Sequence, residues 1–412
     1  MAIDNKDKKV LKSSIEREQN EVACSAECEK IKGSKNLNVP HLRFTEFSGE
    51  WKEELLDRIA TLSKGIGIPK EQLSEDGDPC ILYGELYTKY KSEIIKQVES
   101  KTDIDGSKLK RSKANDVIIP CSGETAVDIA TARCVPFDSI LLGGDLNVIS
   151  LHKYDGAFMS YQLNGKRKYD IARVAQGVSV VHLYGEHLKT IKTYNPTLPE
   201  QQKIAILLSL LDERIATQNK IIEDLEQLKS AIRERLYTQI QEEDFEHKTI
   251  KDVLSYEHPT KYIVVDTEYT DDKKLTPVLT ANKAFILGYT PEQENIYGKG
   301  DCIIFDDFTM DIKFVSFPFK IKSSAIKILT AKTNVNLYFI YEYLLFLNLI
   351  SEEHKRHYIS EIEPLHIVVP CLVIQHKIAE ILQSIDKQIH NARQLQSAYQ
   401  RQKQYLLNQM FI

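Results

Sequence analysis

The sequence has little that would mark a secreted, membrane-bound or metal-dependent protein. Its seven cysteines are scattered, odd in number and without a Cys-x-x-Cys pair, so we expect reduced thiols, a cytoplasmic location and no metal site. The longest apolar runs, 204–211 and 338–350, are too short to span a membrane. Residues 1–12 carry acidic and basic side chains around no apolar core, so we expect no signal peptide.

Catalytic signatures are also missing. The sequence has no Gly-x-Gly-x-x-Gly after a predicted strand, no Walker loop and no Asn/Asp-Pro-Pro-aromatic motif of amino-methyltransferases. The acidic pair Asp306 and Asp307 lacks a further acid or Lys at nuclease spacing, so a polar loop at a strand end explains it better than a metal site. His354 and His357 lie in a charged stretch, which favours a solvated helix end over a metal pair. We therefore expect no catalysis by this chain and no bound cofactor.

The strongest pattern in the chain lies between Leu198 and Ile240. Pro199 stands where a helix loses nothing through a missing N–H, and no Gly or Pro follows it. Apolar residues recur at three- and four-residue spacing, which is typical of one uninterrupted helix with a coiled-coil face. They are Ile204, Leu207, Leu208, Leu211, Ile215, Ile222, Leu225, Leu228, Ile232 and Leu236. At ~1.5 Å per residue, about 40 residues make a rod roughly 60 Å long.

The end of the chain repeats this helix. When Lys203 is placed on Lys377, a series of Ile, Leu, Ala and Asp residues falls into register. The same alignment pairs Pro196 with Pro370, so the repeat includes the chain that enters each helix. A period this long is no solenoid, whose periods are about 20 to 50 residues. We predict a duplicated module, a globular region followed by a long helix, with the two helices antiparallel and side by side.

The regions outside the helices predict mixed structure. Runs of β-forming residues bounded by Gly, Pro and Asp indicate short strands, and a few segments have helical spacing. In the first half we expect strands at Cys80–Tyr83, Asp116–Pro120, Ser139–Leu142, Asn147–Ser150 and Lys189–Tyr194, and helices near Leu55–Ile59 and at Asp155–Leu163. Counterparts occur at Ile250–Leu254, Asp301–Phe305, around Phe339 and at Leu365–Pro370. The fold class is therefore α/β (α+β), with two mixed domains separated by two long antiparallel coiled-coil helices in a pseudo-two-fold repeat.

Several loops place cations beside aromatic and small residues. Such loops can neutralise phosphates and reach base edges in DNA, although solvated loops of a large soluble protein have the same composition. The net charge of −5 argues mildly against a protein that coats nucleic acid by itself. The candidates chosen on this pattern are Lys64, Tyr83, Tyr87, Lys89, Lys91, Lys166 and Arg167 in the first half, and Thr280, Lys283 and Lys313 in the second.

These features together resemble the DNA-specificity subunit of type I restriction-modification systems. The segment Leu198–Ala205 closely matches the family's helix start, and Gln375–Ala379 matches it more loosely. Segments such as Ile81–Gly84, Ser122–Thr125 and Gly143–Leu146 look like one recurring recognition domain, and Thr280–Lys283 with Ile303–Thr309 look like another. The resemblance adds Ser122, Glu124, Thr125, Asn282, Asp306, Asp307 and Thr309 to the candidate DNA contacts. It covers about residues 42 to 412.

The resemblance implies a non-catalytic reader of DNA. Each recognition domain would bind one half of a bipartite, asymmetric site on double-stranded DNA, and the helices would fix the spacing. Two modification subunits with S-adenosylmethionine would dock on this frame, and restriction subunits with ATP and Mg would join for cleavage. The implied parts are an extension (1–41), a first recognition domain (42–195), a central helix (196–240), a second recognition domain (241–370) and a C-terminal helix (371–412). The alternatives are a coiled-coil scaffold without sequence-specific DNA binding and a self-sufficient nuclease or methyltransferase.

Overall fold

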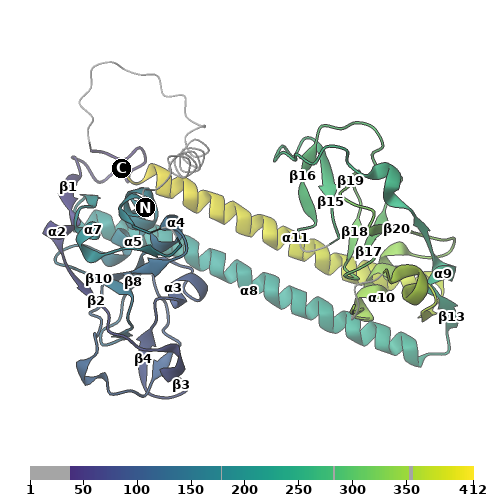
Figure 1. The fold of residues 1–412 in the computed structure, drawn as a ribbon, viewed down its shortest axis with the longest axis horizontal. Coiled ribbons are helices and arrows are strands. Elements are labelled where there is room, and N and C mark those ends of the chain that lie inside the picture. Colours follow the sequence, from purple (N-terminus) through teal and green to yellow (C-terminus); the bar gives the residue numbers. More distant parts are fainter. Residues whose placement is uncertain (1–37, 178, 282–283, 352–355) are drawn as a thin grey trace. The chain divides into compact units, whose positions relative to one another are not determined.

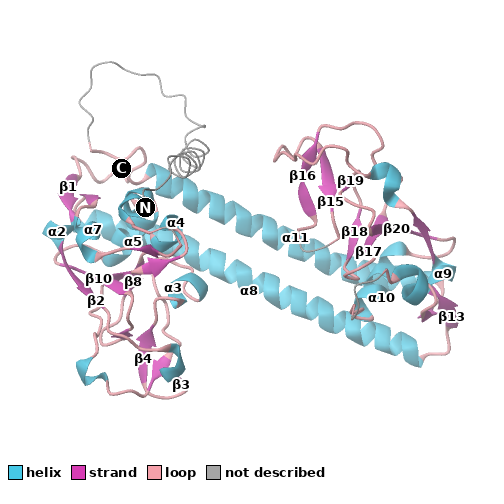
Figure 2. Ribbon diagram, viewed as in Figure 1, coloured by secondary structure: helices cyan, strands magenta, loops and turns pink. Residues whose placement is uncertain are grey.

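The computed structural model describes residues 38–177, 179–281, 284–351 and 356–412, and the chain forms two compact units. The first unit comprises the chain up to Leu210 together with Lys403–Ile412, and the second comprises Leu211–Gln402. Each unit combines helices with small sheets (Figure 2). The predicted α/β fold class with its repeated organisation is confirmed. Most of the predicted extension, with Cys24 and Cys28, lies outside the described residues.

A four-stranded antiparallel sheet forms the centre of the first unit (Figure 1). Its order is β2 (Ala60–Lys64), β10 (Leu146–Leu151), β6 (Asp116–Pro120) and β8 (Arg133–Val135). Successive residues of a strand face opposite sides of the sheet, and Val117 and Ile119 pack in one core while Ile118 packs in another. The sheet is therefore buried on both faces, which explains why β6 is apolar almost throughout.

Smaller elements complete the first unit. Two-stranded sheets join β1 (Lys52–Leu55) with β12 (Lys192–Asn195), and β7 (Ser122–Gly123) with β11 (Val181–His182). A further sheet has the order β3 (Leu73–Ser74), β5 (Lys101–Thr102), β4 (Asp78–Ile81) and β9 (Leu141–Leu142). The helices are α2 (Leu56–Ile59), α3 (Glu85–Thr88), α4 (Ala126–Ile129), α5 (Gly156–Asn164), α6 (Lys168–Val174) and α7 (Gly185–Lys189), with 3₁₀ turns η1 (Lys70–Gln72) and η2 (Gly106–Lys108).

The second unit repeats this frame with other connections. Its main sheet is β14 (Leu254–Glu257), β20 (Ile326–Ala331), β17 (Cys302–Asp306) and β18 (Ile312–Val315). Beside it lie β13 (Glu246–Thr249) paired with β21 (His366–Val369), and the sheet β16 (Ile286–Thr290), β15 (Thr276–Leu279) and β19 (Lys320–Ile321). Its shorter helices are α9 (Ile250–Val253), α10 (Leu337–Phe346), the 3₁₀ turn η3 (Pro259–Tyr262) and the π-helical turn η4 (Tyr358–Ile362).

Two long helices, α8 (Leu198–Glu242) and α11 (Leu372–Gln409), each contain residues of both units. A buried glutamine at the equivalent position of each helix holds the start of that helix in place. The Gln201 side chain accepts a hydrogen bond from Asp155 N at 2.9 Å and donates to Pro196 O at 2.8 Å. Gln375 does the same with Asn336 N and Pro370 O, each at 2.9 Å. The glutamine in the repeated helix start therefore has a structural role in both copies.

In the second unit the two long helices run antiparallel, as predicted. Glu226 of α8 pairs with Arg393 of α11 at 2.5 Å, and Lys229 of α8 pairs with Asp386 of α11 at 2.6 Å. Asn219 accepts a hydrogen bond from Gln396. Partner numbers on α11 fall as those on α8 rise, which only an antiparallel pair allows.

The predicted apolar seam is buried over only part of its length. Leu208 and Leu382 are 0% exposed, whereas Leu228 is 49% exposed and Leu225 is half-buried. Charged and amide side chains such as Glu226 and Asn219 join the two helices in the middle of the pair. The pattern therefore identifies the apolar face of each helix, whereas the depth of burial along that face depends on what packs against it.

Burial predicts that two leucines of these helices contribute unequally to the free energy of unfolding. Leu382→Ala is expected to lower the free energy of unfolding of the second unit by about 2–5 kcal/mol, because a fully buried leucine leaves a cavity. Leu228→Ala, the matched control, should cost less than about 1 kcal/mol, since half of that side chain is already in water. Urea unfolding followed by far-UV circular dichroism measures both. Equal losses would contradict the assigned burial.

A buried charge cluster joins α8, α10 and α11 within the second unit. The Glu342 side chain is 0% exposed and pairs with Lys229 at 2.6 Å and with Arg233 at 2.8 Å. Lys229 also pairs with Asp386, which accepts a hydrogen bond from the Tyr338 hydroxyl. Burial first, and then the charge of Glu342, raise the pKa of Tyr338, so this hydroxyl keeps its proton. The cluster fixes the register of three helices.

The end of α11 completes the core of the first unit. Phe411 is 1% exposed and lies 5.2 Å from the Phe158 ring and 6.3 Å from the Trp51 ring. Gln409 O accepts a hydrogen bond from Leu42 N at 2.9 Å, and Arg167 donates to Ile412 O at 2.8 Å. Residues 403–412 therefore pack with the first unit, although the rest of that unit ends at Leu210 in the sequence.

Most predicted elements occur with shifted ends. β6 has the predicted bounds, and α5 begins at Gly156 because Asp155 caps it by accepting a hydrogen bond from Phe158 N. The helical spacing near Leu56 gives only the single turn α2 between two strands. The predicted strand at Lys189–Tyr194 is shorter, because Gly185–Lys189 forms α7. Among the described helices, none combines the length and apolar composition that a membrane span requires.

Candidate nucleic-acid interface

An exposed cluster of aromatic and basic side chains lies at the end of β2 in the first unit. The Lys64 ammonium lies 5.5 Å from the centre of the Tyr184 ring, and Tyr184 is 44% exposed. His182 stacks on Tyr184 at 6.1 Å with 20° between the planes, and His187 meets the same ring edge-on at 5.5 Å. Tyr184 is therefore the centre of a group of three basic side chains. We call Lys64, His182, Tyr184 and His187 the first-unit cluster.

Strand alternation produces this cluster. β11 pairs with β7 so that His182 is opposite Ser122, and Leu183 N donates to Cys121 O at 2.8 Å. Val181 and Leu183 point into the core, so His182 and Tyr184 point outward. α7 begins at Gly185, and its first turn brings His187 back to Tyr184.

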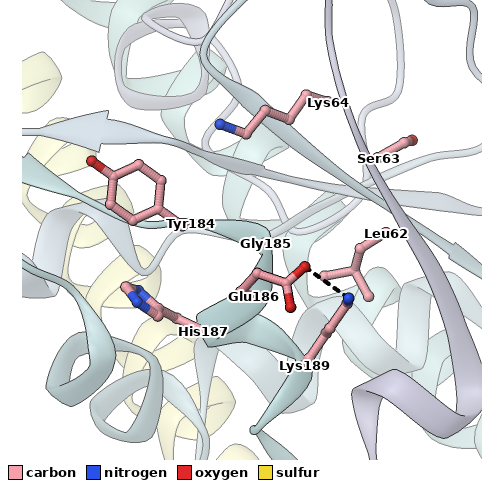
Figure 3. A pocket seen from close by; sticks show the side chains of 8 residues that line it. All are labelled: Leu62, Ser63, Lys64, Tyr184, Gly185, Glu186, His187 and Lys189. Atoms are coloured by element: carbon pink, nitrogen blue, oxygen red, sulfur yellow. Dashed lines mark hydrogen bonds and ion pairs between the residues drawn. The ribbon is translucent and has the colours of Figure 1, made fainter.

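The cluster borders a pocket lined by Leu62, Ser63, Lys64, Lys189 and 184–187 (Figure 3). Figure 3 shows the Lys64 ammonium on the Tyr184 side of the pocket, with Glu186 and Lys189 facing each other. Those two side chains form an ion pair at 2.8 Å, which raises the pKa of the Lys189 ammonium. The pocket therefore offers a paired acid and base together with Lys64 and His187 of the cluster.

Close backbone packing holds the neighbouring loops. A Cβ atom on Gly65 would lie 1.9 Å from Gly143 O, so only glycine fits there. Gly65 N donates to Leu146 O at 2.9 Å, and Ile66 N donates to Leu142 O at 3.0 Å. The loop that follows Lys64 therefore packs against the predicted segment Gly143–Leu146.

The structure brings together some of the residues predicted for the first unit. Lys64 lies in the cluster, and Tyr87 donates a hydrogen bond to Ser122 O at 3.0 Å, close to β11. Burial raises the pKa of the Tyr87 hydroxyl, which therefore stays protonated as a donor. The exposed predicted residues are Lys64, Tyr83, Lys89, Lys91, Glu124, Thr125 and Lys166. Partial burial of the Lys166 ammonium, with the charge of Arg167, lowers its pKa.

Three other first-unit predictions have structural partners within the protein. Lys89 pairs with Glu85 at 2.7 Å, and Thr125 caps α4 by accepting a hydrogen bond from Asp128 N at 3.1 Å. Arg167 pairs with Asp170 at 3.0 Å and donates to Ile412 O. These three side chains have partners within the protein, and their contact with DNA stays a prediction.

The second-unit predictions need a larger correction. Asp307 is 1% exposed, accepts hydrogen bonds from His357 N at 3.1 Å and Tyr358 N at 2.8 Å, and pairs with Lys327 at 3.4 Å. Asp306 is also buried and accepts hydrogen bonds from two backbone N–H groups of the turn that follows it. Neither carboxylate is available to DNA.

The remaining residues predicted for the second unit differ in their exposure and in their hydrogen-bond partners. Thr280 is 8% exposed, Thr309 is exposed and donates to Asp311 at 2.9 Å, and Lys313 is half-buried on β18. His357, expected at a solvated helix end, is instead 2% exposed and hydrogen-bonds Glu361 at 2.7 Å. That expectation is wrong, because a long-range contact with Asp307 buries the histidine. Asn282, Lys283 and His354 lie outside the described residues.

The registers of the two main sheets show which positions correspond. Leu146 pairs with Pro120 in the first unit as Ile326 pairs with Asp306 in the second. Leu183 N donates to the residue after Pro120, and His357 N donates to the residue after Asp306. Tyr184 therefore corresponds to Tyr358. Tyr184 is 44% exposed, whereas Tyr358 is 0% exposed and packs edge-on against Tyr256 at 5.6 Å.

The sequence prediction missed His182, Tyr184 and His187. The alternation of apolar and polar residues from Val181 to Tyr184 was the one signal for them. Four residues are too few to separate a strand edge from a loop. Within the described residues, no group of three or more His, Cys, Asp or Glu side chains could hold a metal ion.

Comparisons with known proteins agree on one family. The model of the type I restriction modification DNA specificity domain matches residues 48–227 and again 242–398. The Escherichia coli type I restriction enzyme EcoR124I/EcoR124II specificity subunit is 43% identical over 144 residues, which cover 32% of this chain and 35% of that protein. The match thus spans about a third of that relative's length.

Two solved structures share the fold. The type I restriction-modification S subunit from M. genitalium is 17% identical, with a TM-score of 0.64 over 91% of this chain and 99% of that one. A structure on complex assembly and conformational transition of the type I R-M system is 14% identical, with a TM-score of 0.50 over 88% of this chain and 97% of its own. The two family matches fall on the repeat seen in the sheets and helix starts, and the chain belongs to the type I restriction modification DNA specificity domain family.

Proposed function

We propose that this chain is the DNA-recognition subunit of a cytoplasmic type I restriction-modification complex, with each unit reading one half of a bipartite, asymmetric site. The observation that carries the proposal is a duplicated frame with two different surfaces. Gln201 and Gln375 make the same contacts, whereas Tyr184 and Tyr358 differ completely in exposure. A retained scaffold with two specialised surfaces suits the reading of two unrelated sequences.

The long helices supply the constant part. α8 and α11 have the same start, and each exposes apolar side chains, among them Ile206, Leu210 and Ile381. We assign to these helices the spacing between half-sites and the docking of two modification subunits. Restriction subunits complete the complex for cleavage, and the E. coli relative is named as part of a type I restriction enzyme.

The chain itself is proposed to be non-catalytic. S-adenosylmethionine, ATP and Mg belong in this proposal to the modification and restriction subunits. The scaffold alternative predicts that no assembly containing the chain selects a DNA sequence. An assembled complex that methylates one defined site separates the two proposals, and methylation by the purified chain alone would contradict both.

Exchanging the recognition domain of one unit tests whether each unit reads its own half of the site. Replacing residues 42–195 by the corresponding region of another specificity subunit should change one half of the methylated site and leave the other half and the gap unchanged. The donor must keep aromatic residues in place of Trp51 and Phe158, because Phe411 packs on both. Long-read sequencing of methylated adenines in a host without other methyltransferases gives the answer.

The reciprocal exchange of residues 241–370 is the control. It should change only the other half-site. If either exchange alters both halves or the gap, recognition is not divided between the units as proposed.

A further inference from the structure

We infer that the first-unit cluster binds a phosphate group of double-stranded DNA and that His182 and His187 strengthen this binding as the pH falls. The inference rests on the proposed function, because it names the site and the charge by which the first unit holds its half of the DNA. Tyr184, His182 and His187 are absent from the residues that the sequence singled out.

The geometry provides a cationic surface around one exposed ring. Lys64, His182 and His187 reach Tyr184 from β2, β11 and α7 respectively. Phosphate oxygens accept hydrogen bonds from ammonium, imidazolium and phenol groups, and such interactions position a protein on DNA. Histidine is the side chain whose charge ordinarily changes between about pH 5 and 8. A cation beside an aromatic face is also favoured by the ring quadrupole.

The other charged groups nearby leave this positive surface in place. Glu186 faces the pocket but pairs with Lys189 on the same turn. Asp145 accepts a hydrogen bond from Ser122 at 3.4 Å, and the Gln176 amide lies 3.4 Å from His187 Nε2. Asp57 acts on Lys189 and raises its pKa together with Glu186. Lys64 supplies an ammonium group beside Tyr184, and the two histidines supply ring nitrogens beside it.

Among its described residues, the second unit has no counterpart of the first-unit cluster. The positions that correspond to His182 and His187 hold Arg356 and Glu361, and Tyr358 is buried. His357 is enclosed by Asp307, Glu361 and Ser351. The pH response should therefore belong to the first half-site alone.

The test uses the assembled complex of this chain with its modification subunits. Binding of a fluorescein-labelled duplex carrying the methylome-defined site is measured by anisotropy at pH 6, 7 and 8 and constant ionic strength. The variant is the double substitution His182→Gln and His187→Gln. The matched control is His247→Gln, an exposed histidine of β13 in the second unit, which accounts for titrations elsewhere in the complex.

Wild type and the control should bind about tenfold more tightly at pH 6 than at pH 8, and the double variant should show little of that difference. At pH 6 the variant should also show a smaller slope of log affinity against log salt, by about 0.9 for each phosphate that the protein no longer neutralises. Phosphate ethylation interference should change in the first half-site only. Thermal unfolding of the variant should match wild type, since His182 is exposed and the buried Nδ1 of His187 makes no hydrogen bond that the substitution would remove.

Three outcomes are distinguishable. Loss of the pH response with the half-site shift in ethylation supports the assignment. Specific binding with an unchanged pH response in the variant overturns it and leaves the proposed function standing. If the wild-type complex selects no sequence at any pH, the proposed function fails and this inference fails with it.

Discussion

Glu342→Leu is expected to lower the free energy of unfolding of the second unit by about 3–5 kcal/mol, the usual cost of removing one partner from a buried ion cluster. The carboxylate is 0% exposed and lies between Lys229 and Arg233, which are themselves largely buried. Its removal leaves two cations close together, with only Asp386 to compensate Lys229.

The matched control is Glu226→Leu on α8, in an ion pair between α8 and α11 that lies outside the buried cluster. Glu226 is 46% exposed and pairs with Arg393 at 2.5 Å, so its loss should cost less than about 1 kcal/mol. Urea unfolding followed by circular dichroism compares the variants. Equal costs would show that the Glu342 cluster contributes no more than a surface pair. Lys229→Met combined with Glu342→Leu and Arg233→Met should recover much of the stability, because it removes the buried cations together with Glu342, while Asp386 is 41% exposed and still accepts a hydrogen bond from Tyr338.

Phe411→Ala is expected to destabilise the first unit by about 3–5 kcal/mol, since a buried phenylalanine that packs on two aromatic rings is lost. Trp51 is the single tryptophan of the sequence and is itself in contact with Phe411. Tryptophan fluorescence therefore reports the unfolding of the first unit alone. Far-UV circular dichroism adds the second unit.

The fluorescence transition should move to lower urea in Phe411→Ala while the later part of the dichroism transition stays in place. Tyr405→Ala near the end of α11 is the control, because Tyr405 is 59% exposed. A shift of both transitions by the same amount would mean that the units unfold as one, and no shift would mean that Phe411 does not complete the first core.

The sequence predicted the long helices and the repeat because both depend on local patterns. The apolar spacing after Pro199 and the alignment of Lys203 with Lys377 need no knowledge of distant contacts. The depth of burial was not predictable in this way. Leu228 and Leu208 look alike in the pattern, but only Leu208 has neighbours that exclude water.

The interface was harder to predict because a charged loop residue has the same appearance whether it faces solvent or a partner. Asp307 and Arg167 were chosen as DNA contacts, yet each meets residues far along the chain. Tyr184 was missed because its exposure depends on how β11 pairs with β7. The registers of both sheets support the correspondence between Tyr184 and Tyr358, and only the structure shows that one ring is exposed where the other is buried.

The place of Phe411 in the first unit has a consequence for synthesis on the ribosome. Its site between Trp51 and Phe158 forms early, but Leu211–Gln402 must be made before residues 403–412 can fill it. At about 5–20 residues per second, that stretch takes roughly 10 to 40 s. Tyr237 holds the corresponding position on α8 and packs on Phe339 as Phe411 packs on Phe158. Tyr237 is made before the rest of the second core, whereas Phe411 is made long after the rest of the first core, so the two units receive this aromatic residue at opposite stages of their synthesis.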